Sequence, residues 1–252
     1  MKLSYKDIID KHKSKTGLCV ATGPSYKPYI DLIGKLSNSK NKFCTLSVNE
    51  FDEMFYLNAD YRVVANSIFT VEREYERFNR NPSTALCYSD TVDTTNKNLV
   101  ENLLNVNYFT YDQRHFGNKT CLELYNEDRS NRCCRHIDST RVTIQEKLKE
   151  YTGYKTLYSS GSTVSLHMLS LSILSGCKNI YIFGVDLDYS KGYAHSNFSN
   201  NDSFNPYLRE IIEDFSTINK SAQNIGVNIF SCCENSPINS VIRYKEINEF
   251  NI

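Results

Sequence analysis

The residues with the greatest capacity for chemistry in this chain lie together between positions 186 and 195. Asp186 and Asp188 follow a run of strand-forming residues, and His195 ends the glycine-containing loop that comes next. Side chains two positions apart on a strand point the same way, so the two carboxylates could hold a divalent ion together; alternatively, Asp186 has a structural role. The imidazole of His195 titrates near neutral pH, which suits a general base, whereas a histidine in a solvated loop needs no function.

A second candidate is the turn formed by Gly23, Pro24 and Ser25, which follows a strand-like run at 18–22 and precedes a predicted helix at 26–36. A strand, a tight turn and a helix in this order can point backbone N–H groups at an anion. The chain lacks the spaced glycines of a dinucleotide-binding loop, and no lysine stands where a P-loop would place it. The turn is therefore either an anion site of another kind or a structural feature alone.

Strands and helices must bring these residues together, and they alternate along the chain. Strands are predicted at 18–22, 43–48, 61–65, 85–88, 106–110, 155–158, 179–184 and 227–232, and helices at 1–16, 26–36, 68–78, 144–151 and 207–225. We predict an α/β fold with a single Rossmann-like, doubly wound, mainly parallel sheet and helices on both faces. Ligands of such a sheet bind at the carboxyl ends of its strands, where both candidate groups fall.

A long uncharged segment lies between Lys155 and Lys178. It includes the small-residue turn Ser159-Ser160-Gly161, after which its apolar residues recur at helical spacing over most of the helix circumference. Such a pattern predicts a buried helix. Its many serines, and a length short of the ~20 residues that cross a bilayer, argue against a membrane span.

The composition is that of an ordinary globular protein, with 40% hydrophobic and 23% charged residues. Lys and Arg number 29, as do Asp and Glu, so the electrostatic basis for general nucleic-acid binding is absent. Nine scattered cysteines without a C-x-x-C pair favour reduced thiols. The lysine-rich start resembles no secretory leader, so we expect a cytoplasmic protein; a peripheral membrane contact and the oligomeric state are left open.

Two polar segments interrupt the alternating pattern. Residues 112–141 carry many arginines, and residues 196–205 are rich in asparagine and serine. The first is either a solvated face or a basic flap over an anionic substrate, and the second is a loop beside the candidate site. We expect both to serve as small irregular lids on a single domain that spans residues 1–252.

Four stretches of the sequence occur in an order that is known from one group of enzymes. They are ATGPS at 21–25, SVNEF at 47–51 followed by FYLNADYRVVANSIF, SSG with its helix and IYIFGVDLDY, and NIFSCCENSPINS near the end. Together they resemble the bacterial sialyltransferases of glycosyltransferase family 42. They are also similar to the related clan of motility-accessory-factor and 6-hydroxymethylpterin diphosphokinase-like proteins.

The resemblance implies an inverting glycosyltransferase that moves a sialic acid or related nonulosonate from a CMP-activated donor to a hydroxyl of a glycan acceptor. It implies that His195 is the general base, that Tyr189 faces the leaving phosphate, and that Asp186 is structural or binds the ribose. The donor would be contacted by Gly23, Pro24, Ser25, Asn49, Asn66, Ser160, Gly161, Asp186 and Tyr189. The family works without a metal, so we expect no metal and no cofactor, while a metal role for Asp188 stays open.

Two other functions use the same crevice. A pterin diphosphokinase would need a nucleoside triphosphate and magnesium, for which Asp186 and Asp188 are the only good ligands in the sequence. A non-catalytic nucleotide-binding protein would keep the glycine turn at 23–25 and make His195 dispensable.

Overall fold

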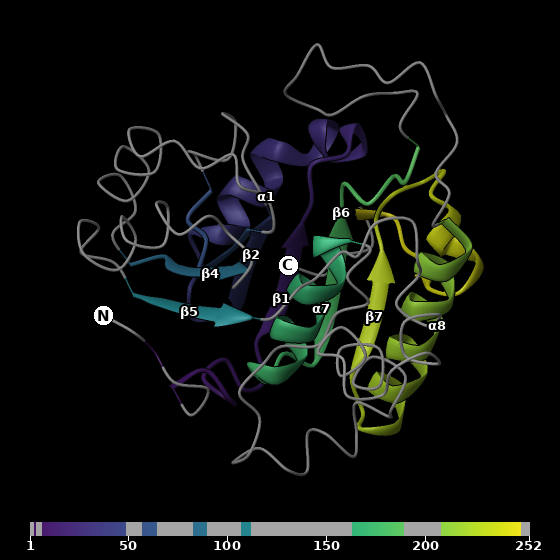
Figure 1. Ribbon diagram of the computed structural model, residues 1–252. Coiled ribbons are helices and arrows are strands. Elements are labelled where there is room, and N and C mark those ends of the chain that lie inside the picture. Colours follow the sequence, from purple (N-terminus) through teal and green to yellow (C-terminus); the bar gives the residue numbers. More distant parts are fainter. Residues whose placement is uncertain are drawn as a thin grey trace.

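Figure 1 presents the computed structural model, in which residues 3, 7–48, 57–64, 83–89, 107–111, 163–188 and 208–247 are described. The strands within these residues form one sheet of eight and are β1 (Thr16–Val20), β2 (Phe43–Val48), β3 (Tyr61–Val64), β4 (Ala85–Ser89), β5 (Tyr108–Tyr111), β6 (Asn179–Phe183), β7 (Asn228–Ser231) and β8 (Arg243–Tyr244). All neighbouring strands run parallel. The predicted α/β fold with a parallel sheet is confirmed.

The order of the strands is β5-β4-β3-β2-β1-β6-β7-β8. The chain therefore moves outward from β1 to one edge of the sheet, returns to pair β6 with the other side of β1, and moves outward again. A reversal of this kind leaves a crevice at the carboxyl ends of the two central strands. In this chain the strand order reverses between β1 and β6.

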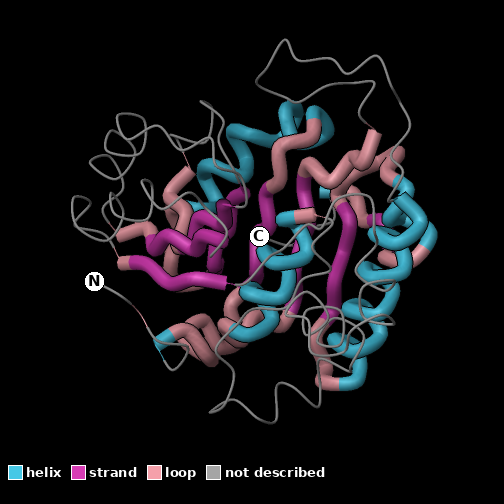
Figure 2. Tube along the Cα trace, viewed as in Figure 1, coloured by secondary structure: helices cyan, strands magenta, loops and turns pink. Residues whose placement is uncertain are grey.

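Helices cover both faces of the sheet, as Figure 2 shows in cyan against the magenta strands. The elements are the 3₁₀ helices η2 (Pro24–Tyr29) and η5 (Pro237–Ser240) and the α-helices α1 (Ile30–Ser37), α7 (Val164–Leu174) and α8 (Leu208–Asn224). Cys19 and Ala21 pack with α7 and α8 in one core. Leu18 and Val20 point to the opposite face and pack with η2 and α1 in a second core, because side chains alternate along a strand.

Helix α7 is the predicted buried helix, and every one of its side chains is buried. It begins at a cap, where the Thr163 hydroxyl oxygen accepts a hydrogen bond from the Ser165 N–H over 3.3 Å. The helix packs against β1, β2, β3 and β6 and so spans the centre of the sheet. No helix in the described part of the chain is both long and apolar enough to cross a membrane.

Gly17 allows α7 to approach β1 closely. A methyl group at this position would overlap Ser172 Oγ and lie 3.3 Å from Cys177 Cβ and from Ile180 Cγ1. We expect Gly17→Ala to lower the free energy of unfolding by about 2 kcal/mol, because an extra methyl must enter a packed core. Urea denaturation of the single variants and of Gly17→Ala with Ser172→Ala measures the coupling. Removal of the Ser172 hydroxyl should recover part of the stability that Gly17→Ala loses. If the losses in free energy of unfolding were purely additive, the two positions would not be in contact.

Two expectations need correction. Residues 7–15 form successive turns rather than part of a helix at 1–16, since Asp10 and Ser14 have φ of 56° and 71°, which right-handed helices exclude. The predicted helix 26–36 is divided into η2 and α1, because Pro28 lacks the N–H that a regular α-helical turn requires. The short elements η5 and β8 were not predicted.

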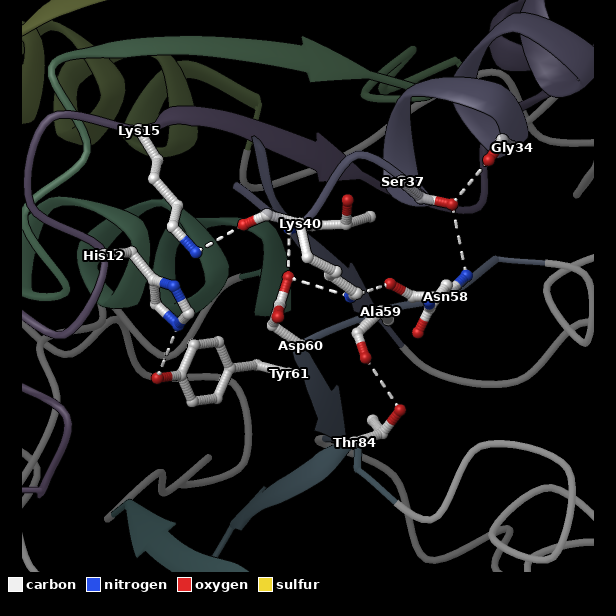
Figure 3. Close-up of polar contacts among 11 residues, drawn as sticks. His12, Lys15, Gly34, Ser37, Lys40, Asn58, Ala59, Asp60, Tyr61 and Thr84 are labelled. Carbon is white, nitrogen blue, oxygen red and sulfur yellow. Dashed lines mark hydrogen bonds and ion pairs between the residues drawn. The ribbon is translucent and has the colours of Figure 1, made fainter. Parts of the chain in front are cut away.

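Polar contacts hold the residues that lead into β3 at the amino edge of the sheet, as Figure 3 shows. The Asp60 carboxylate accepts the Thr45 N–H over 2.9 Å and lies 3.1 Å from the Lys40 ammonium group. Buried His12 shares a 3.1 Å hydrogen bond with the hydroxyl of Tyr61. The contacts of Asp60 hold β2 and β3 in register, and the candidate site lies at the opposite edge.

Candidate functional site

Three loop segments meet beyond the carboxyl ends of β1, β6 and β7. They are residues 21–25, 184–188 and 233–236, and each continues directly from its strand or follows it by one residue. The first segment is tied to the second by the Gly23 N–H, which donates to the Gly184 carbonyl over 2.8 Å. The turn at 23–25 and Asp186, both predicted to belong to the site, are therefore neighbours in space.

Two glycines make this close approach possible. A Cβ atom at Gly23 would overlap the Asp186 carboxylate and lie 2.6 Å from the Gly184 carbonyl oxygen. Gly184 has a φ of +69°, and a Cβ atom there would overlap the Ala21 carbonyl. Gly23 is thus required for space alone, whereas Gly184 is required for both space and backbone conformation.

The carboxylate of Asp186 braces the glycine turn. Its Oδ2 atom accepts the backbone N–H of Ser25 over 3.0 Å. Gly23 donates its own N–H to Gly184, and Pro24 has none, so every N–H group of residues 23–25 is already engaged or absent. This differs from the expectation that the turn offers its N–H groups to a phosphate. The half-buried Asp186 carboxylate accepts the N–H that a phosphate was expected to bind.

Residues 233–236 form the third segment of the site, and no contact with the site was predicted for them from the sequence. The Val185 N–H donates to Cys233 Sγ over 3.2 Å, and the Ser236 hydroxyl donates to the Val185 carbonyl over 2.5 Å. The only signal in the sequence was the motif NIFSCCENSPINS, which resembled a family without indicating a contact. Parallel pairing of β6 with β7 brings this segment to the site.

The thiol of Cys233 is fully buried beside both other segments. Burial raises its pKa to about 11; the Ser25 side chain opposes the rise, and the negative charge of Asp186 adds to it. The thiol is therefore protonated at neutral pH. Ser25 Oγ is itself buried and has no hydrogen bond of ordinary geometry to a described residue, although it lies close enough to Cys233 to influence that pKa.

Several predicted site residues lie outside the described residues. They are the catalytic candidate His195 and the substrate-binding candidates Asn49, Asn66, Ser160, Gly161 and Tyr189. The predicted lid segments 112–141 and 196–205 also lie outside them, as do the strand at 155–158 and the helices at 68–78 and 144–151. Within the described ranges, no three His, Cys, Asp or Glu side chains are grouped in a way that could hold a metal ion.

Comparison with known proteins supports the architecture. No protein-family model matches the chain, and no curated protein matches it. The sialyltransferase CstII from Campylobacter jejuni, in complex with the substrate analogue CMP-3FNeuAc, is similar with a TM-score of 0.50 and 16% identity over 95% of this chain and 89% of that chain. The same enzyme with cytidine-5'-monophosphate gives a TM-score of 0.49 and 19% identity over 95% and 88%. The chain therefore shares its fold with a sialyltransferase.

Proposed function

We propose that this protein is an inverting glycosyltransferase that transfers a sialic acid or related nonulosonate from a CMP-activated donor to a hydroxyl group of a glycan acceptor. The observation that carries the proposal is the junction of Asp186 with the turn at 23–25, at the point where the strand order reverses. The order of the sequence motifs and the shared fold with a sialyltransferase add to this support.

The charge of Asp186 indicates how the donor would lie. A carboxylate and a phosphate ~4 Å apart repel by about 4 kcal/mol near a protein surface, so the donor phosphate would sit away from Ser25 N–H. The remaining lone pairs of the carboxylate suit a neutral hydroxyl group, such as those of a ribose. We place the nucleoside against Asp186 and the turn, with the phosphate further from β1.

The transfer itself needs a base for the acceptor hydroxyl and donors for the departing CMP phosphate. His195 is proposed as the base, since an imidazole exchanges protons near neutral pH. Tyr189 is proposed to donate to the phosphate oxygens, because the turn at 23–25 has no free N–H for them. Asn49, Asn66, Ser160 and Gly161 complete the proposed donor contacts, and no metal ion or cofactor is required.

The nucleotide preference tests the function directly. We expect CMP to bind without added metal, so that at 100 times its dissociation constant it stabilises the folded state by about 2.7 kcal/mol. EDTA should not abolish sugar transfer, and Asn49→Ala should weaken CMP binding. Thermal denaturation with CMP, CDP, ATP and GTP, each with EDTA or with magnesium, measures the preference.

The same nucleotide panel, together with a transfer assay on a glycan array, separates the other two functions. Strict magnesium dependence, with stabilisation by ATP or GTP and none by CMP, would replace the transferase by a pterin diphosphokinase-like enzyme. Binding of CMP without transfer to any acceptor in a glycan array would leave a nucleotide-binding protein without catalytic activity.

A further inference from the structure

The segment that carries Asp186 is not held by a regular secondary structure. Gly184 and Leu187 have φ of 69° and 54°, so the chain turns into the left-handed region on both sides of Val185 and Asp186. A non-glycine residue in that region costs on the order of 1–3 kcal/mol and persists only where the surroundings hold it in place. The position of the Asp186 carboxylate therefore depends on contacts from elsewhere in the fold.

Those contacts come from the segment after β7. Val185 immediately precedes Asp186, and both of its backbone polar groups are bound by side chains of this segment. Its N–H donates to Cys233 Sγ over 3.2 Å, and its carbonyl accepts from the Ser236 hydroxyl over 2.5 Å. Cys233 and Ser236 are 0% and 5% exposed, so water does not compete for either bond.

We propose that Cys233 and Ser236 are positioning residues of the donor site, which orient Val185 so that the Asp186 carboxylate meets the N–H of Ser25. The inference deepens the proposed function, because it names the groups that shape the nucleoside side of that site. Neither side chain needs to touch the donor. Their effect on binding passes through Asp186 and the turn at 23–25.

The thiol of Cys233 suits this role because it both accepts and donates a hydrogen bond. Its sulfur accepts the Val185 N–H, and its S–H donates to the carbonyl of Ile182 over 3.7 Å. A serine hydroxyl can also accept and donate, whereas an alanine methyl can do neither. Cys233→Ser should therefore retain the function that Cys233→Ala loses. Ser236→Thr should likewise retain what Ser236→Ala loses.

The chain offers matched controls for both positions. Cys232 is also buried but belongs to the core on the opposite face of the sheet, so Cys232→Ala removes a thiol without touching Val185. The Ser240 hydroxyl donates to the Pro237 carbonyl over 2.8 Å in the same helix η5, and Ser240→Ala removes a hydroxyl away from the site. Ser236 also caps η5 by accepting the Ile238 N–H over 3.3 Å, so its loss affects stability as well.

Two measurements on the full chain test the proposal. Amide hydrogen exchange at Ser25 reports the bond to Asp186 without any ligand, and titration calorimetry reports the affinity for CMP. In Cys233→Ala and Ser236→Ala we expect exchange at Ser25 to be at least about tenfold faster and CMP affinity at least about tenfold weaker, in line with the loss of one buried hydrogen bond. The serine and threonine variants and both controls should behave as wild type.

The outcomes separate this proposal from the proposed function. Unchanged exchange at Ser25 in both alanine variants would overturn the positioning role, as would an equal effect in Cys232→Ala or Ser240→Ala. Failure of the wild-type protein to bind CMP would overturn the proposed function instead, while the exchange measurement would still decide whether Cys233 and Ser236 position the turn. If an alanine variant does not fold, Cys233→Val and Ser236→Val remove the same side-chain hydrogen bonds while still filling the space, and Ser236→Thr is the isosteric control for the second; these variants then decide the question.

Discussion

Replacing His195 by alanine is expected to lower the turnover number at least about 100-fold while the protein still binds CMP. In the proposed transfer, the acceptor hydroxyl must lose its proton as it attacks the sugar, and without a base that proton has no acceptor of suitable pKa. CMP affinity should persist because the proposed nucleoside contacts come from Asp186 and the turn at 23–25. Steady-state kinetics with a CMP-activated sialic acid and a glycan acceptor, together with calorimetry, measure the two effects.

Ser196→Ala is the control for this experiment, since it changes the adjacent position of the same sequence segment. Its turnover number should stay within about threefold of wild type, well short of the effect of losing a general base. Turnover near the wild-type value in His195→Ala would remove the histidine from the mechanism. A loss confined to CMP affinity would assign His195 to donor binding instead.

The protein is expected to lose up to about 3 kcal/mol of stability through His12 as the pH falls from neutrality towards 4. His12 is 5% exposed, and burial lowers its pKa from 6.5 to about 4, partly offset by the negative charge of Asp60; Lys15, Lys11 and Lys40 lower it further. Its Nδ1 atom is buried without a partner among the described residues, so an added proton there would have no acceptor.

The sign of the effect follows from which state binds the proton. Between pH 6.5 and pH 4 the unfolded chain protonates His12 while the folded protein keeps it neutral, so the stability from this group is complete above pH 6.5 and is lost as the pH falls. Urea denaturation across this range should show a shallower decline in His12→Phe than in wild type. Tyr61→Phe should keep most of the decline, because burial is the largest cause of the shift. Equal declines in wild type and His12→Phe would contradict the assignment.

The strands show what local sequence can predict. Residues 43–48 were expected to form a strand, and β2 has the same bounds with all six residues buried. The uncharged segment between Lys155 and Lys178 correctly predicted α7 as a buried helix. Both predictions depend on runs of side chains that are buried on folding. Such runs can be recognised in the sequence without knowledge of the residues they pack against.

Turn geometry was harder to predict. The start at 1–16 has a helical composition, yet residues 7–15 form turns, since the His12 N–H donates to the Ser175 carbonyl and the Asp10 N–H to that of Leu174. Those bonds run to the end of α7, far away in the sequence. A local pattern contains no information about them, because tertiary hydrogen bonds override a weak helix preference.

In the candidate site, too, some features could be predicted from local sequence and others could not. The sequence by itself determined that Gly23, Pro24, Ser25 and Asp186 fall at the carboxyl ends of two strands, since strand ends and glycine turns are local features. Only the tertiary structure decided that the Asp186 carboxylate takes the N–H of Ser25 and that Cys233 and Ser236 hold the residue before it. The reason is physical: the pairing of β1 with β6 joins residues 163 positions apart, and the pairing of β6 with β7 joins residues 49 positions apart. The hydrogen-bond partners of a buried group depend on that pairing.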